Sequence, residues 1–265
     1  MSHHLLVTGG TGVLGRHVVG RLVDGGHDIR VLSRRPAPVP PGIRHVLADL
    51  SKDADLGPAL DGVEIVLHLA GSARGDGRKT ERLVRAARTA RVRHLVLISV
   101  VGADRVPVRS LRDRMAFGYY AEKRAAEFAV EGLGLPFTVL RATQFHDLLL
   151  RTFAGMRRSP VAVAFRGVRF QPVEAAEVAD RLVELALEAP QGLVDPVAGP
   201  HVVPMADLLR SYLQATDAPK RILLLGTGGA AAAAIRAGAN LDPAHAVGRL
   251  TWEEFLAARV GPAAR

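Results

Sequence analysis

The chain has 265 residues, of which 48% are hydrophobic and 23% are charged, and its formal net charge is +9. A chain of this length can bury a substantial core and form one large domain, or a domain with a smaller appendage. It contains no cysteine, which excludes disulfides, thiolate catalysis and cysteine-ligated metal sites.

The positive charge is spread along the chain and is not gathered in one block. Only four of the 35 basic residues are lysines, and the arginines occur in every segment. Such scatter is typical of a solvated surface, so we expect no nucleic-acid partner. No segment approaches the ~20 uninterrupted apolar residues of a membrane span, and the chain begins directly with a predicted strand instead of a secretory leader. We therefore expect a cytoplasmic protein without a membrane partner.

A glycine-rich turn lies near the start of the chain. Gly9, Gly12 and Gly15 follow an apolar run at 5–7 and precede a helical pattern at 13–23. In a nucleotide-binding βαβ unit one glycine makes the tight turn, one lets the backbone approach a pyrophosphate, and one allows close helix–strand packing. The new helix then presents amides to an anion. The turn residues expected at the cofactor are Thr8, Gly9, Thr11, Gly12, Val13, Leu14 and Gly15.

Short apolar runs alternate with helical patterns through the first half of the chain. This alternation predicts an α/β fold, a Rossmann-type doubly wound parallel sheet. After the opening unit, strands are predicted at 43–47, 65–69, 95–99 and 137–140, and helices at 80–90 and 115–131.

The alternation weakens after residue 141. Helices are predicted at 144–156, 174–188, 205–215, 229–239 and 252–260, and strands at 161–165, 168–173 and 193–197. We assign residues 1–142 to an NAD(P)-binding Rossmann core and residues 143–265 to a C-terminal part. Within that part, segments 168–198 are expected to return to the core, and the rest to form a small substrate-binding cap at the carboxyl edge of the sheet, where ligands bind in such folds.

The end of the second strand selects the dinucleotide. An NAD enzyme usually places an acidic residue there, but this chain has Ser33, Arg34 and Arg35 and no acid until Asp49. Two guanidiniums can clamp a 2′-phosphate with charge-assisted hydrogen bonds. We therefore predict NADP(H) in preference to NAD(H). Asp49 and Leu50 follow the third strand, where Asp49 either receives the adenine edge or caps a helix.

Tyr119 and Lys123 lie four residues apart in a predicted helix and therefore share one of its faces. A neighbouring cation favours the phenolate and brings the pKa of a phenol closer to working pH. A tyrosine so placed is usable as a general acid or base. The spacing is common by chance, but here it accompanies the glycine turn and falls on the helix between the fifth and sixth strands.

These features together resemble the short-chain dehydrogenase/reductases, specifically the extended or atypical branch and its NmrA-like, NAD(P)-binding members. The glycine turn with the tyrosine–lysine pair is the specific part of the resemblance. It is carried by 8–15, Asp49-Leu50, His68-Leu69-Ala70-Gly71, 97–102, Tyr119 with Lys123, 135–141 and 170–173.

The resemblance implies hydride transfer at the nicotinamide, with Tyr119 exchanging a proton with the substrate oxygen. Lys123 would bind the nicotinamide ribose, and Leu69, Ala70 and Gly71 would line the cofactor's path. The family's serine or threonine usually stands one or two positions beyond the strand-ending serine, where this chain has valines at 100 and 101. Ser99 is therefore either the catalytic partner or a strand-end residue.

If Ser99 is not in the site, the substrate carbonyl must be positioned from elsewhere, and the candidates are Thr143, Gln144 and His146. The residues predicted to contact the substrate are Gln144, Phe145 and His146. His146 is followed by Asp147, but two adjacent ligands without a histidine at helical spacing do not indicate a metal. We therefore expect no metal site.

The leading interpretation is an NADPH-dependent oxidoreductase, a ketone or enone reductase or an alcohol dehydrogenase, acting on a small organic molecule in secondary metabolism. One alternative is a non-catalytic NADP-binding sensor of NmrA type, in which an activated phenol has no use. Another is an epimerase or isomerase with bound NAD(P), which would use the same residues. The sequence leaves open whether the protein is a monomer or a homodimer.

Overall fold

The structure is a computed structural model that describes residues 2–52, 55–72, 74–156 and 159–260. The chain divides into two compact units. Unit 1 comprises Met1–Ser99, Gly118–Arg141 and Ala176–Asp195, and unit 2 comprises Val100–Phe117, Ala142–Ala175 and Pro196–Arg265. Each unit therefore takes segments from both halves of the chain.

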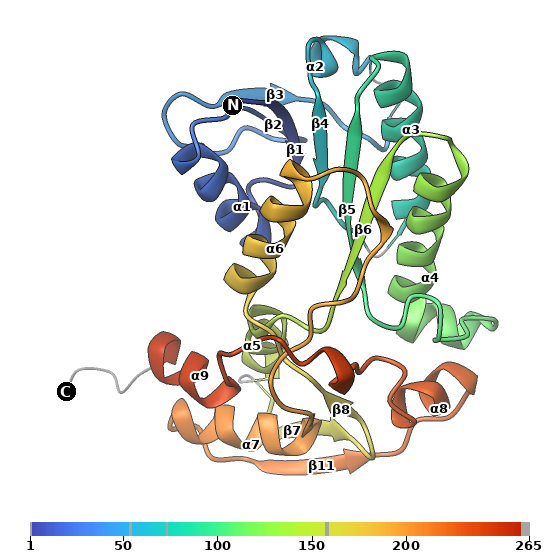
Figure 1. Ribbon diagram of the computed structural model, residues 1–265. Coiled ribbons are helices and arrows are strands. Elements are labelled where there is room, and N and C mark those ends of the chain that lie inside the picture. The colour runs from blue at the N-terminus through green and yellow to red at the C-terminus, as the bar shows by residue number, and fades with distance from the viewer. Residues whose placement is uncertain (1, 53–54, 73, 157–158, 261–265) are drawn as a thin grey trace. The chain divides into compact units, whose positions relative to one another are not determined.

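Unit 1 is built on a seven-stranded parallel sheet (Figure 1). Its strands are β1 (His4–Thr8), β2 (Asp28–Ser33), β3 (Arg44–Leu47), β4 (Ile65–His68), β5 (His94–Val100), β6 (Phe137–Ala142) and β9 (Gly192–Leu193). They run in the order β3-β2-β1-β4-β5-β6-β9, which contains the strand order of a doubly wound dinucleotide-binding fold. The predicted fold class, an α/β Rossmann-type parallel sheet, is confirmed.

Helices cover the sheet of unit 1. They are α1 (Val13–Asp24), α2 (Gly57–Leu60), α3 (Asp76–Thr89), the part of α4 (Leu111–Gly132) from residue 118 onward, and α6 (Ala175–Leu187). Leu6 and Leu97 of the sheet pack in one buried cluster with Leu83 of α3 and Ala126 of α4. Burying one such leucine contributes about 1.5–3 kcal/mol. This packing fixes α3 and α4 against the same face of the sheet.

Unit 2 consists of short strands and helices. They are α5 (His146–Gly155), β7 (Val161–Phe165), β8 (Arg169–Phe170), β10 (Val203–Pro204), α7 (Met205–Ala215), β11 (Arg221–Leu225), α8 (Ala230–Arg236), a 3-10 helix (Pro243–His245) and α9 (Trp252–Val260). β11 pairs with β7 in parallel, and β10 pairs with β8 antiparallel. Phe153, Tyr212 and Trp252 meet in an aromatic core.

Strongly periodic segments agree with the sequence predictions, and α7 and α9 coincide with the predicted helices at 205–215 and 252–260. The predicted strand at 193–197 is shorter, because only Gly192–Leu193 pair with β6 and Val197 forms an isolated bridge. Pro196 lies between them and lacks the N–H that a continued ladder would need. β11, β10 and the one-turn helix α2 were not predicted from the sequence.

In the part of the chain that the structure describes, no helix has the length and apolar character to cross a membrane. The same residues contain no group of three histidine, aspartate or glutamate side chains arranged to hold a metal ion.

Candidate cofactor and active site

A cavity of about 520 Å³ opens in unit 1 where β1, β2 and β4 end. This is the edge of a doubly wound sheet at which ligands bind. The predicted cofactor residues that line it are Thr8, Gly9, Thr11, Gly12, Ser33, Arg34, Arg35, Asp49, Leu50, Leu69, Ala70 and Gly71. Val13, Leu14 and Gly15 lie in the first turn of α1, outside this lining. Contact of each residue with a cofactor stays a prediction.

The backbone at Gly9 and Gly15 leaves no room for a side chain. Gly9 has φ +74°, and a Cβ on it would lie 2.6 Å from the backbone N of Ala70. A Cβ on Gly15 would lie 2.1 Å from the carbonyl oxygen of Gly9. Gly12 donates its N–H to that oxygen at 3.0 Å, and α1 starts after Gly12 without a side-chain cap among the described residues. A backbone this close to the cavity, with open first-turn amides, fits a dinucleotide pyrophosphate.

The loop after β2 carries the two arginines predicted to read the 2′-phosphate. Arg34 and Arg35 are exposed and line the cavity. Ser33 anchors the loop, because its hydroxyl donates to the carbonyl of Arg35 at 2.5 Å and lies 2.7 Å from Nε2 of His45. The loop therefore places two permanent positive charges on the cavity wall, which suits an anionic ligand group.

Asp49 makes a local turn. Its Oδ1 accepts hydrogen bonds from the hydroxyl and the backbone N–H of Ser51, at 2.7 and 2.9 Å. These two bonds, with the charge of Arg34 adding to them, lower the pKa of the Asp49 carboxyl. The next helix begins only at Gly57, so Asp49 is not its cap, and its side chain lies at the cavity instead.

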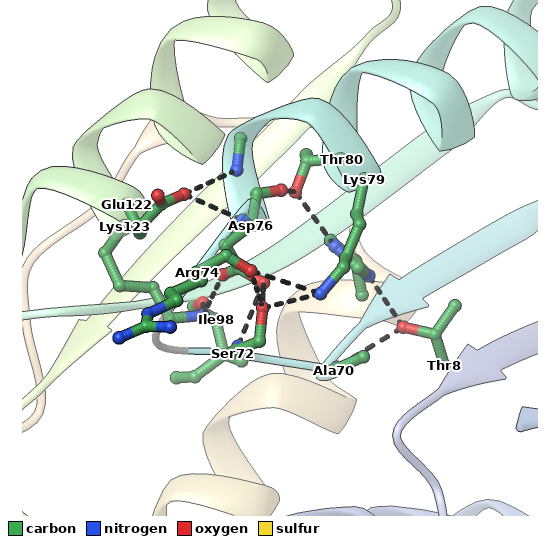
Figure 2. A network of polar contacts seen from close by, with 12 residues as sticks. Thr8, Ala70, Ser72, Arg74, Asp76, Lys79, Thr80, Ile98, Glu122 and Lys123 are labelled. Atoms are coloured by element: carbon green, nitrogen blue, oxygen red, sulfur yellow. Dashed lines mark hydrogen bonds and ion pairs between the residues drawn. The ribbon is translucent and has the colours of Figure 1, made fainter. Parts of the chain in front are cut away.

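Lys123 is buried in unit 1 and lies against the cofactor cavity. Its side chain is 4% exposed, and Nζ lies 3.1 Å from Oδ2 of Asp76 and 3.4 Å from the carbonyl oxygen of Ile98. A Cβ on Gly71, a cavity-lining residue, would lie 3.0 Å from the same Nζ. The ammonium is thus held next to a residue of the cavity wall. Figure 2 shows the Lys123 side chain together with Asp76 and Ile98.

Tyr119 lies one helical turn before Lys123 and is 41% exposed, so its phenol is accessible to a small molecule. The centroid of its ring lies 5.9 Å from Nζ of Lys123, within the range of a cation–π contact. Tyr120 meets this ring edge-on at 6.1 Å. Burial, and to a smaller extent Tyr119, raises the pKa of the Tyr120 phenol, so Tyr120 stays protonated.

The structure adds residues to the site that the sequence did not reveal. Ser72, Asp76 and Lys79 line the cavity. α3 begins at Asp76, four residues before the predicted start, because Oε2 of Glu122 accepts the backbone N–H of Asp76 at 2.8 Å. Glu122 caps the helix from α4, and such a tertiary cap leaves no local pattern in the sequence. Asp76 just after Gly75 was the available signal, since acidic residues favour a first helical turn.

Ser99 is buried in β5 and lies on the side of Glu127. Its hydroxyl makes no hydrogen bond of ordinary geometry with the described residues, but it helps to lower the pKa of the Glu127 carboxyl. Burial has the largest influence on that pKa and raises it, but the donors of Arg141 and Arg124, with the nearby Ser99 hydroxyl adding to them, outweigh burial. A catalytic role for Ser99 stays a prediction.

The three predicted substrate residues belong to unit 2. Gln144 is buried and spans two backbone groups, donating to the carbonyl of Asn240 at 3.0 Å and accepting from the N–H of Gln171 at 3.1 Å. Phe145 bridges Val173. His146 is fully buried, with its ring stacked on Phe255 at 4.9 Å. Their contact with a substrate also stays a prediction.

Residues 9–189 match a family model described as NAD(P)H-binding. These residues are more than half of the chain and include the glycine turn, the arginine loop and Lys123. The chain belongs to this NAD(P)H-binding family. The predicted cofactor class is therefore confirmed, and the glycine turn, the arginine loop and the wall at Gly71 are the parts of this family member that fit such a cofactor.

Two curated relatives are reductases. The chain is 30% identical over 229 residues to (4-alkanoyl-5-oxo-2,5-dihydrofuran-3-yl)methyl phosphate reductase of Streptomyces griseus subsp. griseus, covering 84% of this chain and 77% of that protein. It is 31% identical over 206 residues to ceramide reductase of Caulobacter vibrioides, covering 71% of this chain and 62% of that protein. The chain is thus an NAD(P)H-binding protein of reductase type.

Solved structures share the fold at lower identity. The NADPH-dependent quinone oxidoreductase QOR2 of Escherichia coli, complexed with NADPH, has a TM-score of 0.77 and 20% identity, covering 96% of this chain and 99% of that one. MoeE5 in complex with UDP-glucose and NAD has a TM-score of 0.74 and 20% identity, with 97% of each chain covered. The predicted membership of the NmrA-like short-chain dehydrogenase/reductases stays a prediction.

Proposed function

We propose that the protein is an NADPH-dependent reductase of a small organic carbonyl or enone, with Tyr119 as the proton donor. The observation that carries the proposal is the position of the Lys123 ammonium. It lies beside Gly71 at the cavity wall and 5.9 Å from the Tyr119 ring. One lysine therefore connects the cofactor cavity with an accessible phenol.

Each part of the cavity has a role in this proposal. The glycine turn and the first amides of α1 bind the pyrophosphate. Arg34 and Arg35 bind the 2′-phosphate and select NADPH over NADH. Lys123 donates to the nicotinamide ribose. When NADPH is bound, its nicotinamide supplies a hydride to the substrate carbon.

The proton comes from Tyr119. As the hydride reaches the carbonyl carbon, the oxygen gains negative charge, and the Tyr119 O–H donates its proton to that oxygen. With a ketone the product is the alcohol. With an enone the hydride would go to the β-carbon, Tyr119 would protonate the resulting enolate, and the product would be the saturated carbonyl compound. The nearby Lys123 ammonium stabilises the phenolate that remains until a solvent proton replaces the one transferred.

The test is NADPH oxidation by the purified protein with a panel of ketones, enones and unsaturated lactones. We expect turnover with at least one of them, and a loss of about 10²–10⁴ in kcat for Tyr119→Phe. Tyr120→Phe is the matched control, because it removes the hydroxyl of the adjacent, more buried tyrosine and should leave kcat within twofold (about the usual error of such comparisons). If Tyr119→Phe turns over as fast as the wild type, Tyr119 is not the proton donor.

One observation favours a second candidate, a non-catalytic NADP(H) sensor. The Ser99 side chain lies near Glu127. Positions 100 and 101, where short-chain dehydrogenase/reductases usually have their serine or threonine, are buried valines. A sensor would bind NADPH with the same arginines but oxidise none of it with any member of the panel. The turnover experiment therefore separates the two candidates.

A further inference from the structure

Among the described residues, Asp76 is the only one whose carboxylate forms an ion pair with Lys123. Both side chains are nearly excluded from solvent, with 3% exposure for Asp76 and 4% for Lys123. An ammonium buried alone would lose its hydration without compensation, which costs several kcal/mol. Asp76 supplies that compensation at 3.1 Å.

The carboxylate of Asp76 is itself fixed in place. Its Oδ1 accepts the backbone N–H of Ser72 at 3.0 Å and the Ser72 hydroxyl at 3.3 Å. The backbone N–H of Asp76 donates to Oε2 of Glu122 at 2.8 Å. Glu122 immediately precedes Lys123 on α4, so the start of α3 is tied to α4 by two successive residues. Figure 2 shows these contacts converging on Asp76.

This network of Ser72, Asp76 and Lys123 lies next to the cavity, so it can affect how a cofactor binds there. Gly71, Ser72 and Asp76 all line the cavity, and Lys123 Nζ lies next to Gly71. An ammonium has three N–H donors. The carboxylate of Asp76 and the carbonyl of Ile98 are the acceptors nearest to two of them, and a ribose hydroxyl in the cavity can take the third.

The other polar groups around Lys123 do not replace Asp76. On α4, Glu122 is engaged with the start of α3, and Glu127 receives Arg124 and Arg141. On β4, His68 is neutral near pH 7, because burial lowers its pKa to about 4. Tyr119 presents its ring to the ammonium. Asp76 is therefore the group that sets where the charge of Lys123 lies.

We propose that Asp76 is a positioning residue for the cofactor: its carboxylate holds the Lys123 ammonium beside Gly71, where the ammonium donates to a ribose hydroxyl of NAD(P)H. This inference deepens the proposed function and rests on its assignment of Lys123 to the ribose. It gives Asp76 no contact with the reacting atoms. Its effect on binding passes through Lys123.

The test is a double-mutant cycle on cofactor affinity. Asp76→Asn keeps an oxygen for the Ser72 N–H and removes the charge that holds Lys123. We expect the Kd for NADPH, measured by fluorescence titration, to rise about tenfold in Asp76→Asn, a coupling of the size usual for residues in contact. In a Lys123→Met background the same substitution should change Kd by less than about twofold, because the residue through which Asp76 acts is absent.

Glu81→Gln is the matched control, because it neutralises another carboxylate of α3 that lies outside the cavity lining and leaves the Asp76–Lys123 ion pair; Kd should stay within about twofold of the wild type. If Asp76→Asn weakens binding equally with and without Lys123, Asp76 acts by shaping α3 and the inference is wrong. Should Asp76→Asn fail to fold, the comparison of Lys123→Met with the double variant still decides, since a further loss in the double variant contradicts the inference.

The titration also keeps this inference separate from the proposed function. It measures binding of NADPH and needs no substrate. If Asp76 and Lys123 are coupled but the protein turns over no substrate, the proposed catalysis is wrong and the positioning role of Asp76 stands. Turnover of a substrate without coupling between Asp76 and Lys123 would support the proposed catalysis and contradict the positioning role of Asp76.

Discussion

The Thr8 hydroxyl lies 2.6 Å from Nδ1 of His68, across the paired ends of β1 and β4. On the other side of the ring, Nε2 lies 3.0 Å from the Thr80 hydroxyl, which donates to the carbonyl of Asp76 at 2.9 Å. Thr80 must then accept from Nε2–H, so Nδ1 is the unprotonated nitrogen and accepts from Thr8. The chain of bonds is complete only with a neutral histidine.

His68 therefore makes stability depend on pH. Burial lowers its pKa from 6.5 to about 4; the charge of Lys123 also lowers it, and Asp76 acts in the opposite direction. Between pH 6.5 and about 4 the unfolded chain binds a proton that the folded chain does not. The free energy of unfolding should thus fall as the pH falls through this window, by at most about 3 kcal/mol.

Urea unfolding at several pH values inside and above this window measures the effect. His68→Gln should flatten the part of the slope that belongs to this residue, whereas the exposed His201, replaced by Gln, should leave the slope unchanged. An equal slope in the wild type and His68→Gln would contradict the assignment.

A methyl group at position 15 should disrupt the glycine turn. Because a Cβ there would lie 2.1 Å from the Gly9 carbonyl oxygen, Gly15→Ala must displace backbone, and we expect a loss of about 1–3 kcal/mol in the free energy of unfolding. Gly20→Ala is the control in the same helix. Its Cβ meets nothing within 4 Å, so it should be neutral or stabilising by up to about 1 kcal/mol. Urea unfolding of both variants distinguishes a local clash from a general intolerance of alanine in α1.

Glu127 should be the most sensitive carboxylate of α4. It is 0% exposed and receives both Nε and a terminal nitrogen of Arg141, each at 2.8 Å. Glu127→Gln removes the buried carboxylate charge that receives both Arg141 and Arg124, so we expect a loss of about 3–5 kcal/mol in the free energy of unfolding. The exposed pair of Glu81 and Arg85 serves for comparison, and Glu81→Gln should cost less than about 0.5 kcal/mol. Similar losses in the free energy of unfolding for the two variants would show that the buried pair of Glu127 and Arg141 stabilises the fold no more than the exposed pair of Glu81 and Arg85.

The arginine loop should set the preference between the two dinucleotides. Replacing both Arg34 and Arg35 by serine removes the charged donors proposed for the 2′-phosphate, and the Kd for NADPH should rise about 10- to 100-fold. The Kd for NADH, which lacks that phosphate, should change little. Arg44→Ser removes an exposed arginine of β3 outside the cavity lining and measures the effect of losing one positive charge elsewhere on the surface. Equal loss of affinity for NADPH and NADH would disprove selection by this loop.

Much of the cofactor wall could be predicted from the sequence because its signals are local. Successive glycines at 9, 12 and 15 are three positions apart, and the arginines at 34 and 35 directly follow β2. The C-terminal part was harder, because β11 pairs with β7, about sixty residues earlier in the chain, and no periodicity within either segment records a partner at that distance.

The sequence by itself determined the βαβ unit, the doubly wound sheet and the face that Tyr119 shares with Lys123, since each follows from backbone period and turn chemistry within a short window. Which charge meets Lys123 depends on the packing of the helices. Asp76 stands 47 positions earlier in the chain, and the packing of α3 and α4 on one sheet face brings its carboxylate to 3.1 Å. Such a contact depends on where two helices are held, which the spacing of residues within either helix does not specify.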